Sequence, residues 1–377
     1  MATILITGGA GFIGSKLTQR LLGAGHAVRV LDLLAAQIHG PAARAPAWTK
    51  SEGVEFIRSS VTNRESLAAA IRGVDAIVHL AAETGTGQSM YEIARYNEVN
   101  TQGTALLLDT LVGSPGHTVK RIVLASSRSI YGEGAYLSER GDRVFPGARS
   151  AEALARQQWE PTDVDTGRPL KAVPTRETDP PRPASIYAAT KYAQEDLVRI
   201  ACEAARIGYA ILRLQNVYGE GQSLNNPYTG ILSIFSTRIR LGKVLPLFED
   251  GEESRDFVHV DDVVSAIERC LTIEQSPNTT INVGSGVATS VRAVAEGLSS
   301  ALGRPLNITI TGDYRIGDIR HNWADISRLH AILSLQPRVS LSEGLKRFAA
   351  WVEEQPLPED RLDHANAELK ARNLMSR

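Results

Sequence analysis

Tyr187 and Lys191 stand four positions apart in the segment Tyr-Ala-Ala-Thr-Lys, so on a helix they would share one face. A free tyrosine has a pKa of about 10 and is a poor base at neutral pH. A neighbouring ammonium favours the phenolate and lowers that pKa toward the working range. The pair therefore predicts a phenolate base that takes the proton of an alcohol.

A glycine-rich loop near the start of the chain predicts a ligand that would lie beside that base. Residues 7–14 read Thr-Gly-Gly-Ala-Gly-Phe-Ile-Gly, after an apolar run and before a helical stretch. Gly8 and Gly9 allow a tight turn, and Gly14 lets the helix pack closely on the strand. Gly11 lets the backbone approach a pyrophosphate at the start of the helix. The loop predicts a dinucleotide site that includes Gly8, Gly11, Phe12, Ile13 and Gly14.

Asp32 ends the next apolar run, where a carboxylate binds the hydroxyls of an adenosine ribose. The same carboxylate would repel a 2′-phosphate, so NAD is favoured over NADP. A base beside a nicotinamide removes a proton from an alcohol while hydride leaves its carbon. The combination predicts an oxidoreductase-type enzyme that acts on a secondary alcohol.

Composition excludes several other classes. The chain has 377 residues, which suits two joined domains, and a formal net charge of −1, which implies neither a nucleic-acid partner nor a membrane surface. Cys202 and Cys270 are too few and too far apart for a metal knuckle or a disulfide scaffold. No apolar stretch approaches the roughly 20 residues of a membrane span, and the first residues leave no room for a signal peptide. We expect no metal and a cytoplasmic location.

Short apolar runs alternate with amphipathic ones through the first half, which is the pattern of a parallel sheet with crossover helices. The fold class is therefore α/β, a Rossmann-type doubly wound parallel sheet with a smaller, interleaved C-terminal substrate-binding domain. The expected strands are Ala2–Ile6, Ala27–Leu31, Glu55–Arg58, Ala76–Leu80, Arg121–Ala125 and Ala210–Leu214. The expected helices include Ser15–Leu22, Arg64–Ile71, Thr101–Leu111 and Ala188–Ala205.

Beyond residue 216 the amino-acid composition becomes more polar and richer in glycine and proline. We expect a dinucleotide-binding domain of residues 1–216 plus about 256–283, and a substrate domain of residues 217–255 plus 284–354. An insert at about 133–184 has little periodicity, which predicts a folded flap near the active site or a dimer arm. The charged tail 355–377 is expected to be mobile or to pack at an interface.

Further candidates lie at the ends of predicted strands, where ligands bind in open α/β sheets. Ser127 ends a buried strand, and its hydroxyl can donate to the reacting oxygen while Tyr187 takes the proton. Lys191 would also anchor the nicotinamide ribose. Asn100 either caps the next helix or holds the cofactor-binding turn. His79 is expected to be a core residue. The remaining cofactor candidates are Leu80, Ala81, Ala82 and Ala125.

Together, the glycine loop, Asp32, Ser127, Tyr187 and Lys191 resemble an extended short-chain dehydrogenase/reductase of the NAD-dependent epimerase/dehydratase family. The resemblance extends to about residue 352 and includes the segments 213–219, 255–262, 282–284 and 317–320. It implies a nucleoside-diphosphate sugar as substrate, oxidised at C4 to a ketone. It also implies that Asn216, Arg255 and Arg320 bind the sugar nucleotide, the arginines at its diphosphate. Where relatives have an Asp-Ile/Val pair near the adenine, this chain has Ser60 and Val61.

The two residues after the catalytic serine bear on the type of reaction. Dehydratases of the family carry acids there, whereas this chain has Arg128 and Ser129, which favours epimerisation. A ketoreductase that exchanges its cofactor stays open, as does a decarboxylase, for which Arg128 would bind a carboxylate. A non-catalytic NAD-binding protein is a further alternative. Thr84 is expected to line the sugar pocket, and the neighbouring Glu83 would repel an acidic sugar, which favours a neutral one.

The segment 125–134, the long insert and residues 226–231 resemble a narrower branch that includes bacterial 4-epimerases of the dTDP-L-rhamnose type. The resemblance implies a dTDP- or UDP-linked sugar as partner. It also implies a homodimer formed through two helices, one of which carries the Tyr/Lys pair. The apolar residues Ala193, Leu197, Ile200 and Ala201 on that helix allow such an interface.

Overall fold

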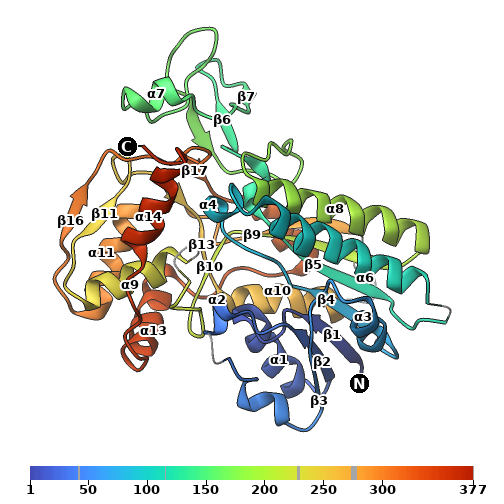
Figure 1. Cartoon of the computed structure of the whole chain (residues 1–377). Helices are drawn as coiled ribbons and strands as arrows, with labels where there is room; N and C mark the ends of the chain where they lie inside the picture. Colours follow the sequence, from blue (N-terminus) through green and yellow to red (C-terminus); the bar gives the residue numbers. More distant parts are fainter. Residues whose placement is uncertain (41–42, 115, 227–229, 273–277, 377) are drawn as a thin grey trace.

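The computed structural model describes residues 1–40, 43–114, 116–226, 230–272 and 278–376. Its centre is a sheet of seven parallel strands in the order β14-β9-β5-β4-β1-β2-β3 (Figure 1). The doubly wound Rossmann-type sheet predicted from the sequence is confirmed, with strand ends that differ by one or two residues. The strands are β1 (Thr3–Thr7), β2 (Ala27–Asp32), β3 (Val54–Arg58), β4 (Ala76–His79), β5 (Arg121–Ser127), β9 (Gly208–Leu214) and β14 (Thr279–Val283).

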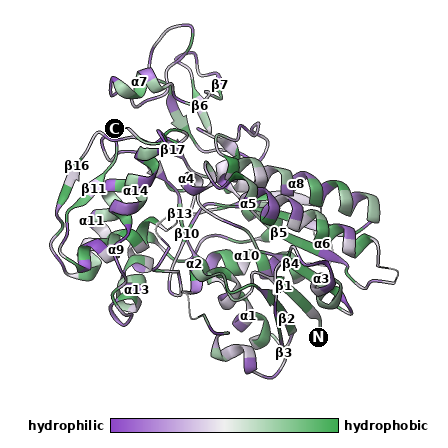
Figure 2. Cartoon of the chain, in the orientation of Figure 1, coloured by the Kyte–Doolittle hydropathy of each residue, from purple (hydrophilic) through white to green (hydrophobic). Residues whose placement is uncertain are grey.

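Helices cover both faces of this sheet, which explains why its strands are almost continuously apolar. In β1, Ile4 and Ile6 enter one hydrophobic cluster while Leu5 enters the other. Figure 2 shows the central strands as largely hydrophobic. The first face carries α1 (Phe12–Gly23), α10 (Val260–Thr272) and α12 (Ser327–Leu333). The second face carries α3 (Arg64–Ile71), α6 (Gly103–Val112) and α8 (Ile186–Ala205).

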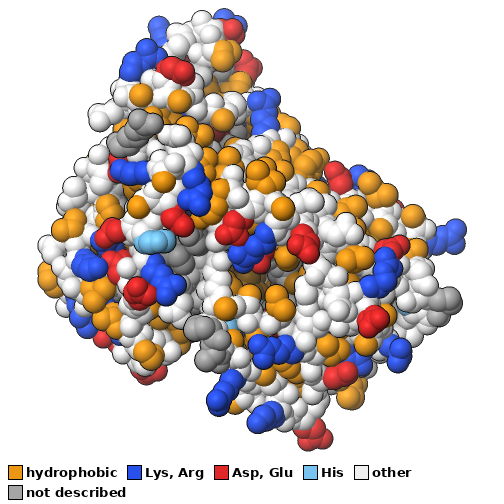
Figure 3. All heavy atoms as spheres, in the orientation of Figure 1, with side chains coloured by type: hydrophobic (Ala, Val, Ile, Leu, Met, Phe, Trp, Pro, Cys, Tyr) orange, Lys and Arg blue, Asp and Glu red, His pale blue; other side chains and the backbone are white. Residues whose placement is uncertain are grey.

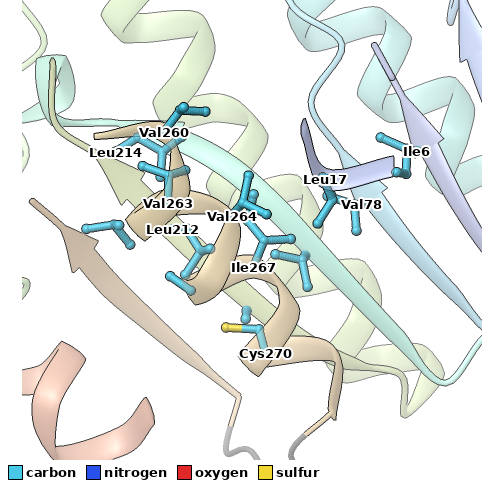
Figure 4. Packing of buried hydrophobic residues seen from close by; sticks show 14 of the residues in the cluster. Ile6, Leu17, Val78, Leu212, Leu214, Val260, Val263, Val264, Ile267 and Cys270 are labelled. Atoms are coloured by element: carbon cyan, nitrogen blue, oxygen red, sulfur yellow. The ribbon is translucent and has the colours of Figure 1, made fainter. Parts of the chain in front are cut away.

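The packing of α10 shows how a late segment completes the early sheet. Val263, Val264 and Ile267 are buried in the same cluster as Leu212 of β9 and Leu17 of α1 (Figure 4). Because side chains three and four positions apart share a helix face, one stripe of α10 meets the sheet. Residues 260–272 therefore belong structurally with the first half of the chain.

A third hydrophobic cluster forms what we call the C-terminal lobe. It includes Tyr218, Phe235, Leu247, Leu298 and Phe348, and it is separate from the two clusters that flank the sheet. The elements of the lobe are α9 (Ile231–Arg240), β11 (Leu245–Leu247), α11 (Val291–Leu302), β16 (Ile308–Ile310) and α13 (Leu341–Glu353).

The long insert is folded, although its sequence has little periodicity. It contains a three-stranded antiparallel sheet, β7-β6-β8, and one short helix, and it projects at the top of Figure 1. A buried ion-pair cluster of Glu133, Arg149, Glu249 and Arg320 joins it to the lobe. Arg149 lies 2.9 Å from Glu133 and 2.8 Å from Glu249, which also lies 3.0 Å from Arg320. The elements are β6 (Ala135–Leu137), β7 (Arg143–Val144), α7 (Ala151–Ala155) and β8 (Lys171–Val173).

The last residues fold back onto the chain as the helix α14 (Leu362–Ala371). Leu362, Ala365 and Leu369 are buried, as is Met375 beyond the helix. The tail therefore packs within its own chain, an arrangement that the sequence did not indicate.

The remaining elements are short. They are the α-helices α2 (Ala36–His39), α4 (Thr86–Ser89) and α5 (Ile93–Tyr96), the 3-10 helices η1 (Ala47–Lys50) and η3 (Arg128–Tyr131), the π-helix η2 (Asn97–Gln102), and the strands β10 (Asn216–Tyr218), β12 (Ser254–Arg255), β13 (Phe257–His259), β15 (Thr289–Ser290) and β17 (His321–Asn322). No helix in the described part of the chain combines the length and apolarity that a membrane span requires. On the face drawn in Figure 3, acidic and basic side chains are interspersed.

Candidate active site

A cavity of about 520 Å³ lies where the carboxyl ends of β1, β4, β5 and β9 meet the C-terminal lobe. The strand order reverses between β1 and β4, and such a reversal is where open α/β sheets bind their ligands. Most of the predicted site residues line this one cavity. They are Gly8, Gly11, Phe12, Ile13, Gly14, Asp32, Ser60, Val61, Leu80, Ala81, Ala82, Thr84, Ser127, Arg128, Tyr187 and Asn216.

At one end of the cavity the glycine loop brings the backbone close to its neighbours. A Cβ at Gly8 would lie 2.8 Å from the Ala81 nitrogen, and the φ of Gly8 is 70°. A Cβ at Gly14 would lie 2.5 Å from the Gly9 Cα, so a side chain there would push the helix off the loop. Helix α1 starts at Phe12 without a side-chain cap, and Gly11, Phe12 and Ile13 line the cavity. Uncapped N–H groups at a helix start suit an anionic pyrophosphate.

Asp32 lies at the same end, and its carboxylate is only 8% exposed. Its Oδ2 accepts a hydrogen bond from the Ala10 N–H at 2.9 Å, and its Oδ1 accepts one from the Leu34 N–H at 2.8 Å. Each oxygen keeps a further lone pair for a ribose hydroxyl. Ser60 and Val61 line the cavity nearby, and the Ser60 hydroxyl is bonded to that of Thr62 at 2.8 Å. This end fits a dinucleotide such as NAD.

Asn100 does not cap a helix, because it lies inside η2. Its Oδ1 accepts from the Glu83 N–H at 2.8 Å, and its Nδ2 donates to the Glu83 carbonyl at 3.1 Å. The fully buried side chain thus holds the turn after β4, which is the second of its two predicted roles, without lining the cavity itself.

His79 is the core residue that the sequence predicts. It is buried between the hydroxyls of Thr7 at 2.7 Å and Thr104 at 2.9 Å. Burial, aided by the charge of Lys191, lowers the pKa of His79 to about 3. The imidazole is therefore neutral at physiological pH and holds β4 against its neighbours.

Tyr187 and Ser127 both line the cavity. Ser185 caps α8 by accepting from the Ala188 N–H, which places Tyr187 in the first helical turn, opposite the end of β5. Burial raises the pKa of Tyr187, while a hydrogen bond with Ser127 and the charge of Arg128 act to lower it. Ser127 also pairs with the Ser129 hydroxyl at 2.8 Å.

The sequence predicts that the Lys191 ammonium lowers the pKa of Tyr187, but the groups that act to lower this pKa are Ser127 and Arg128. The Nζ of Lys191 donates a hydrogen bond to Gln194 Oε1 at 2.6 Å. Burial lowers the pKa of Lys191 to about 7, although the charge of Glu195 opposes this shift. An ammonium without a close carboxylate partner is costly to bury, which is the cause of the shift.

The structure adds two side chains that sequence reasoning missed. Glu195 accepts from the Ser126 hydroxyl at 2.5 Å and from Arg213 Nη2 at 2.8 Å, so it joins α8 to β5 and β9. Its spacing of four from Lys191 was a signal that could have found it. The ring of Tyr96 lies edge-on to Tyr187 with centroids 6.4 Å apart, and its hydroxyl donates to the Thr84 carbonyl at 2.7 Å. No local pattern marks Tyr96.

The other end of the cavity carries polar atoms that need a ligand. Arg128 Nε donates to Asn216 Oδ1 at 2.7 Å, but Arg128 Nη1 is buried and finds no partner among the described residues. The same holds for both polar atoms of the Gln215 side chain and for Gln222 Oε1, and all these residues line the cavity. Burial and the charge of Arg255 lower the pKa of Arg128 to about 9. This end fits a polar ligand that carries negative charge.

Arg320 is a correction to the predicted site. Its guanidinium is 2% exposed and pairs with Glu160 at 2.7 Å, Glu249 at 3.0 Å and Asp250 at 2.7 Å. Because three carboxylates already surround its charge, this arginine is not available to a diphosphate. Arg255 donates to the carbonyls of Ser254 and Arg320, at 2.8 and 2.9 Å. The cavity lining does not include Arg255, Ala125 or Lys191.

The sheet and the cavity define a Rossmann-type dinucleotide-binding enzyme. The chain belongs to the NAD dependent epimerase/dehydratase family, whose model matches residues 4–153 and 164–284. NAD is accordingly its cofactor, and the family predicted from the motifs is confirmed.

Among curated proteins, the chain is 42% identical over 354 residues to the dTDP-L-rhamnose 4-epimerase of Burkholderia thailandensis, covering 93% of this chain and 95% of that one. It is 28% identical to the solved UDP-glucose 4-epimerase of Thermotoga maritima with UDP-glucose, with a TM-score of 0.75 over 93% of this chain and 99% of that one. The UDP-glucuronic acid 4-epimerase of Bacillus cereus, solved with UDP-glucuronic acid and NAD, is 25% identical, with a TM-score of 0.76 over the same shares.

Proposed function

We propose that this protein inverts C4 of a nucleoside-diphosphate sugar through a 4-keto intermediate. One observation carries the proposal: Tyr187 and Ser127 line the same cavity as a glycine loop that fits NAD and as a group of polar side chains with orphaned atoms. NAD, when bound, takes hydride from the sugar carbon and later returns it.

Tyr187 takes the proton of the C4 hydroxyl, and Ser127 donates a hydrogen bond to the same oxygen. The resulting ketone is flat at C4, so it can turn and present its other face. Tyr187 then returns the proton to the new hydroxyl, and neither water nor carbon dioxide is lost. Lys191 holds a hydroxyl of the nicotinamide ribose, in line with its place one helical turn beyond Tyr187.

The sugar end supports a neutral sugar on a diphosphate. Glu83 lines the cavity, so a uronate carboxylate would meet a like charge there, and the ion pair of Glu83 with Arg95 at 2.8 Å reduces that repulsion. Arg128 and Asn216, which line the cavity, would bind the diphosphate and sugar oxygens. Arg255, whose charge helps to lower the pKa of Arg128, would add positive charge for the diphosphate. With the relative of 42% identity, these features favour a dTDP-L-rhamnose-type substrate over UDP-glucose or UDP-glucuronate.

We also propose the division of labour and the assembly that the sequence suggested. Residues 1–216 with 256–283 hold the cofactor, and residues 217–255 with 284–354 hold the nucleotide sugar. The protein works as a homodimer joined through α8, whose Ile200 is 56% exposed, and an Ile200→Glu variant should sediment as a monomer. A cytoplasmic location is supported by two buried free cysteines, and fractionation of cells would check it.

The decisive experiment offers purified protein, without added nicotinamide, separate samples of dTDP-L-rhamnose, UDP-glucose and UDP-glucuronate, followed by proton NMR. We expect inversion at C4 of dTDP-L-rhamnose with no loss of water or carbon dioxide. Turnover only after NADH or NADPH and a ketosugar are supplied would favour a ketoreductase. Release of carbon dioxide from the uronate would favour a decarboxylase.

A further inference from the structure

The last residues of the chain, 355–376, form a segment that we call the C-terminal strap, with α14 at its centre. It lies beyond the residues that the family model matches. Two ion pairs fix its start to the lobe: Asp360 lies 2.9 Å from Lys243, and Asp363 lies 2.9 Å from Arg238. At its end, backbone hydrogen bonds join Leu374 to Ile316 at 3.0 Å and Ser376 to Tyr314 at 2.9 Å. The strap is therefore anchored to the lobe at both ends.

Between these anchors, α14 contacts α4 on the sheet side of the molecule (Figure 1). The methyl groups of Leu369 lie 3.5 Å from where a Cβ of Gly87 would stand. The Arg372 guanidinium lies 4.2 Å from the centre of the Tyr91 ring, and the Tyr91 hydroxyl donates to Glu368 Oε2 at 3.2 Å. These contacts bridge the lobe and the segment that comes after β4.

The contacted segment is also part of the active site. Thr84, Gly85 and Thr86 line the cavity immediately before Gly87. Within α4, Ser89 is fully buried, and its Oγ accepts a hydrogen bond from the Tyr187 N–H at 3.0 Å. A displacement of α4 would therefore move both the wall of the sugar pocket and the first turn of the helix that carries the base.

We propose that the C-terminal strap is a positioning element for the reaction: Leu369 and Arg372 hold α4, and α4 sets the place of Tyr187 and of the sugar. This proposal rests on the proposed function for its kinetic consequences. Neither Leu369 nor Arg372 lines the cavity, whereas the glycine loop and Asp32 do. The strap should therefore act on turnover and on the sugar, and not on the retention of NAD.

The variants to compare are Leu369→Ala, Arg372→Ala and the double variant with both. Leu369→Met keeps the apolar contact and should rescue the loss. Arg361→Ala is the matched control, because Arg361 lies in the same strap but is 58% exposed and pairs with the exposed Glu359. A misplacement on the order of 1 Å costs up to about a hundredfold in rate, so we expect kcat/KM of Leu369→Ala to fall about tenfold, mostly in kcat.

Hydrogen exchange of the purified full chain provides a readout that needs no sugar. The amides of residues 84–91 and 186–190 should exchange faster in Leu369→Ala and Arg372→Ala, and normally in Arg361→Ala and Leu369→Met. Bound NAD, measured by absorbance after denaturation, should be unchanged in all variants. Failure to find any sugar substrate would count against the proposed function alone, since the exchange result would still stand.

Two outcomes would overturn the proposal. One is unchanged exchange of residues 84–91 and 186–190 in both single variants. The other is unchanged kcat and KM in variants whose thermal midpoint has fallen, because the strap would then stabilise the lobe without positioning the site.

Discussion

The two ends of the cavity differ in the groups that face a ligand, which are mainly backbone at one end and mainly side chains at the other. The dinucleotide end uses backbone: an uncapped helix start, a glycine whose Cβ would strike the Ala81 nitrogen, and one carboxylate held by two N–H groups. The sugar end uses side chains such as Arg128, Asn216 and Gln222, which come from separate segments and meet only in the fold. Backbone recognition tolerates few changes of residue, whereas side-chain recognition can be altered one residue at a time. Chains with one cofactor can in this way diverge in their sugars.

The largest effect should come from the group between the two ends. Tyr187→Phe removes the proton acceptor, and general-base catalysis is worth about 10² to 10⁴-fold, so we expect kcat to fall about 10³-fold. The NMR assay of epimerisation would measure this, with Tyr192→Phe, five residues further along the same helix, as the matched control. Loss of bound NAD in Tyr187→Phe would contradict the assignment of NAD retention to the dinucleotide end alone.

At the dinucleotide end, the addition of a single methyl group should be enough to weaken NAD binding. Gly8→Ala forces a residue with a side chain to a φ of 70° and sets its Cβ 2.8 Å from the Ala81 nitrogen, which costs about 1–3 kcal/mol in strain. We expect the purified variant to lose most of its NAD, as absorbance after denaturation would report. In Gly23→Ala, where nothing lies within 4 Å of the added Cβ, NAD content should not change. Full NAD content in Gly8→Ala would contradict the backbone account.

At the sugar end, the loss of one side chain should have a smaller effect on ligand binding. Arg128→Met removes the Nη1 donor and the bond to Asn216, and a hydrogen bond to a charged group is worth about 1.5–3 kcal/mol. We expect KM for the sugar nucleotide to rise at least about tenfold while NAD content stays constant. Arg168→Met, at a 66% exposed arginine, is the control. An unchanged KM would remove Arg128 from the proposed sugar site.

The last prediction concerns stability rather than activity, and it depends on the buried Lys191. Its pKa of about 7 in the folded chain lies below the value of about 10.4 for an unfolded one, so the unfolded chain binds one more proton between these pH values. The free energy of unfolding should therefore rise with pH there, by at most about 1.4 kcal/mol per unit. The cost of the buried ammonium is complete below about pH 7 and is lost as pH approaches 10.

Lys191→Met should abolish that contribution. Urea unfolding of both proteins across the same pH range would measure it, and the stability advantage of the variant should be largest at the acid end. A difference between the two proteins that does not change with pH would show that the pKa of Lys191 is not lowered in the folded chain.

The same division explains what the sequence could predict. Six strands of the main sheet and the glycine loop rest on local patterns, and these appear where the sequence placed them, whereas the edge strand β14 was not predicted. The predicted role of Arg320 at the diphosphate was wrong, because a sequence does not distinguish an arginine that is free to bind a ligand from one that is paired with carboxylates. Its partners Glu160, Glu249 and Asp250 are far away along the chain. Tyr96 and the strap were missed for the same reason: their contacts join segments distant in sequence.

Asn100 shows an intermediate case. The sequence offered a cap or a hold on the cofactor-binding turn, and both are polar roles near a helix start. The choice depended on η2, which continues the helix through Asn100 and leaves the side chain free to bind Glu83. Local patterns identified the residue, and the fold decided its function.

The buried ion-pair cluster of Glu133, Arg149, Glu249 and Arg320 has a consequence for chimeric enzymes. Exchange of the insert alone with that of a relative would leave Glu249 and Arg320 without Arg149 and Glu133, and breaking a buried pair costs about 3–5 kcal/mol. The insert and the lobe residues around 249 and 320 therefore form one module for grafting, although Arg149 and Glu249 stand 100 positions apart in the chain. A designer who seeks a new sugar specificity should transplant them together.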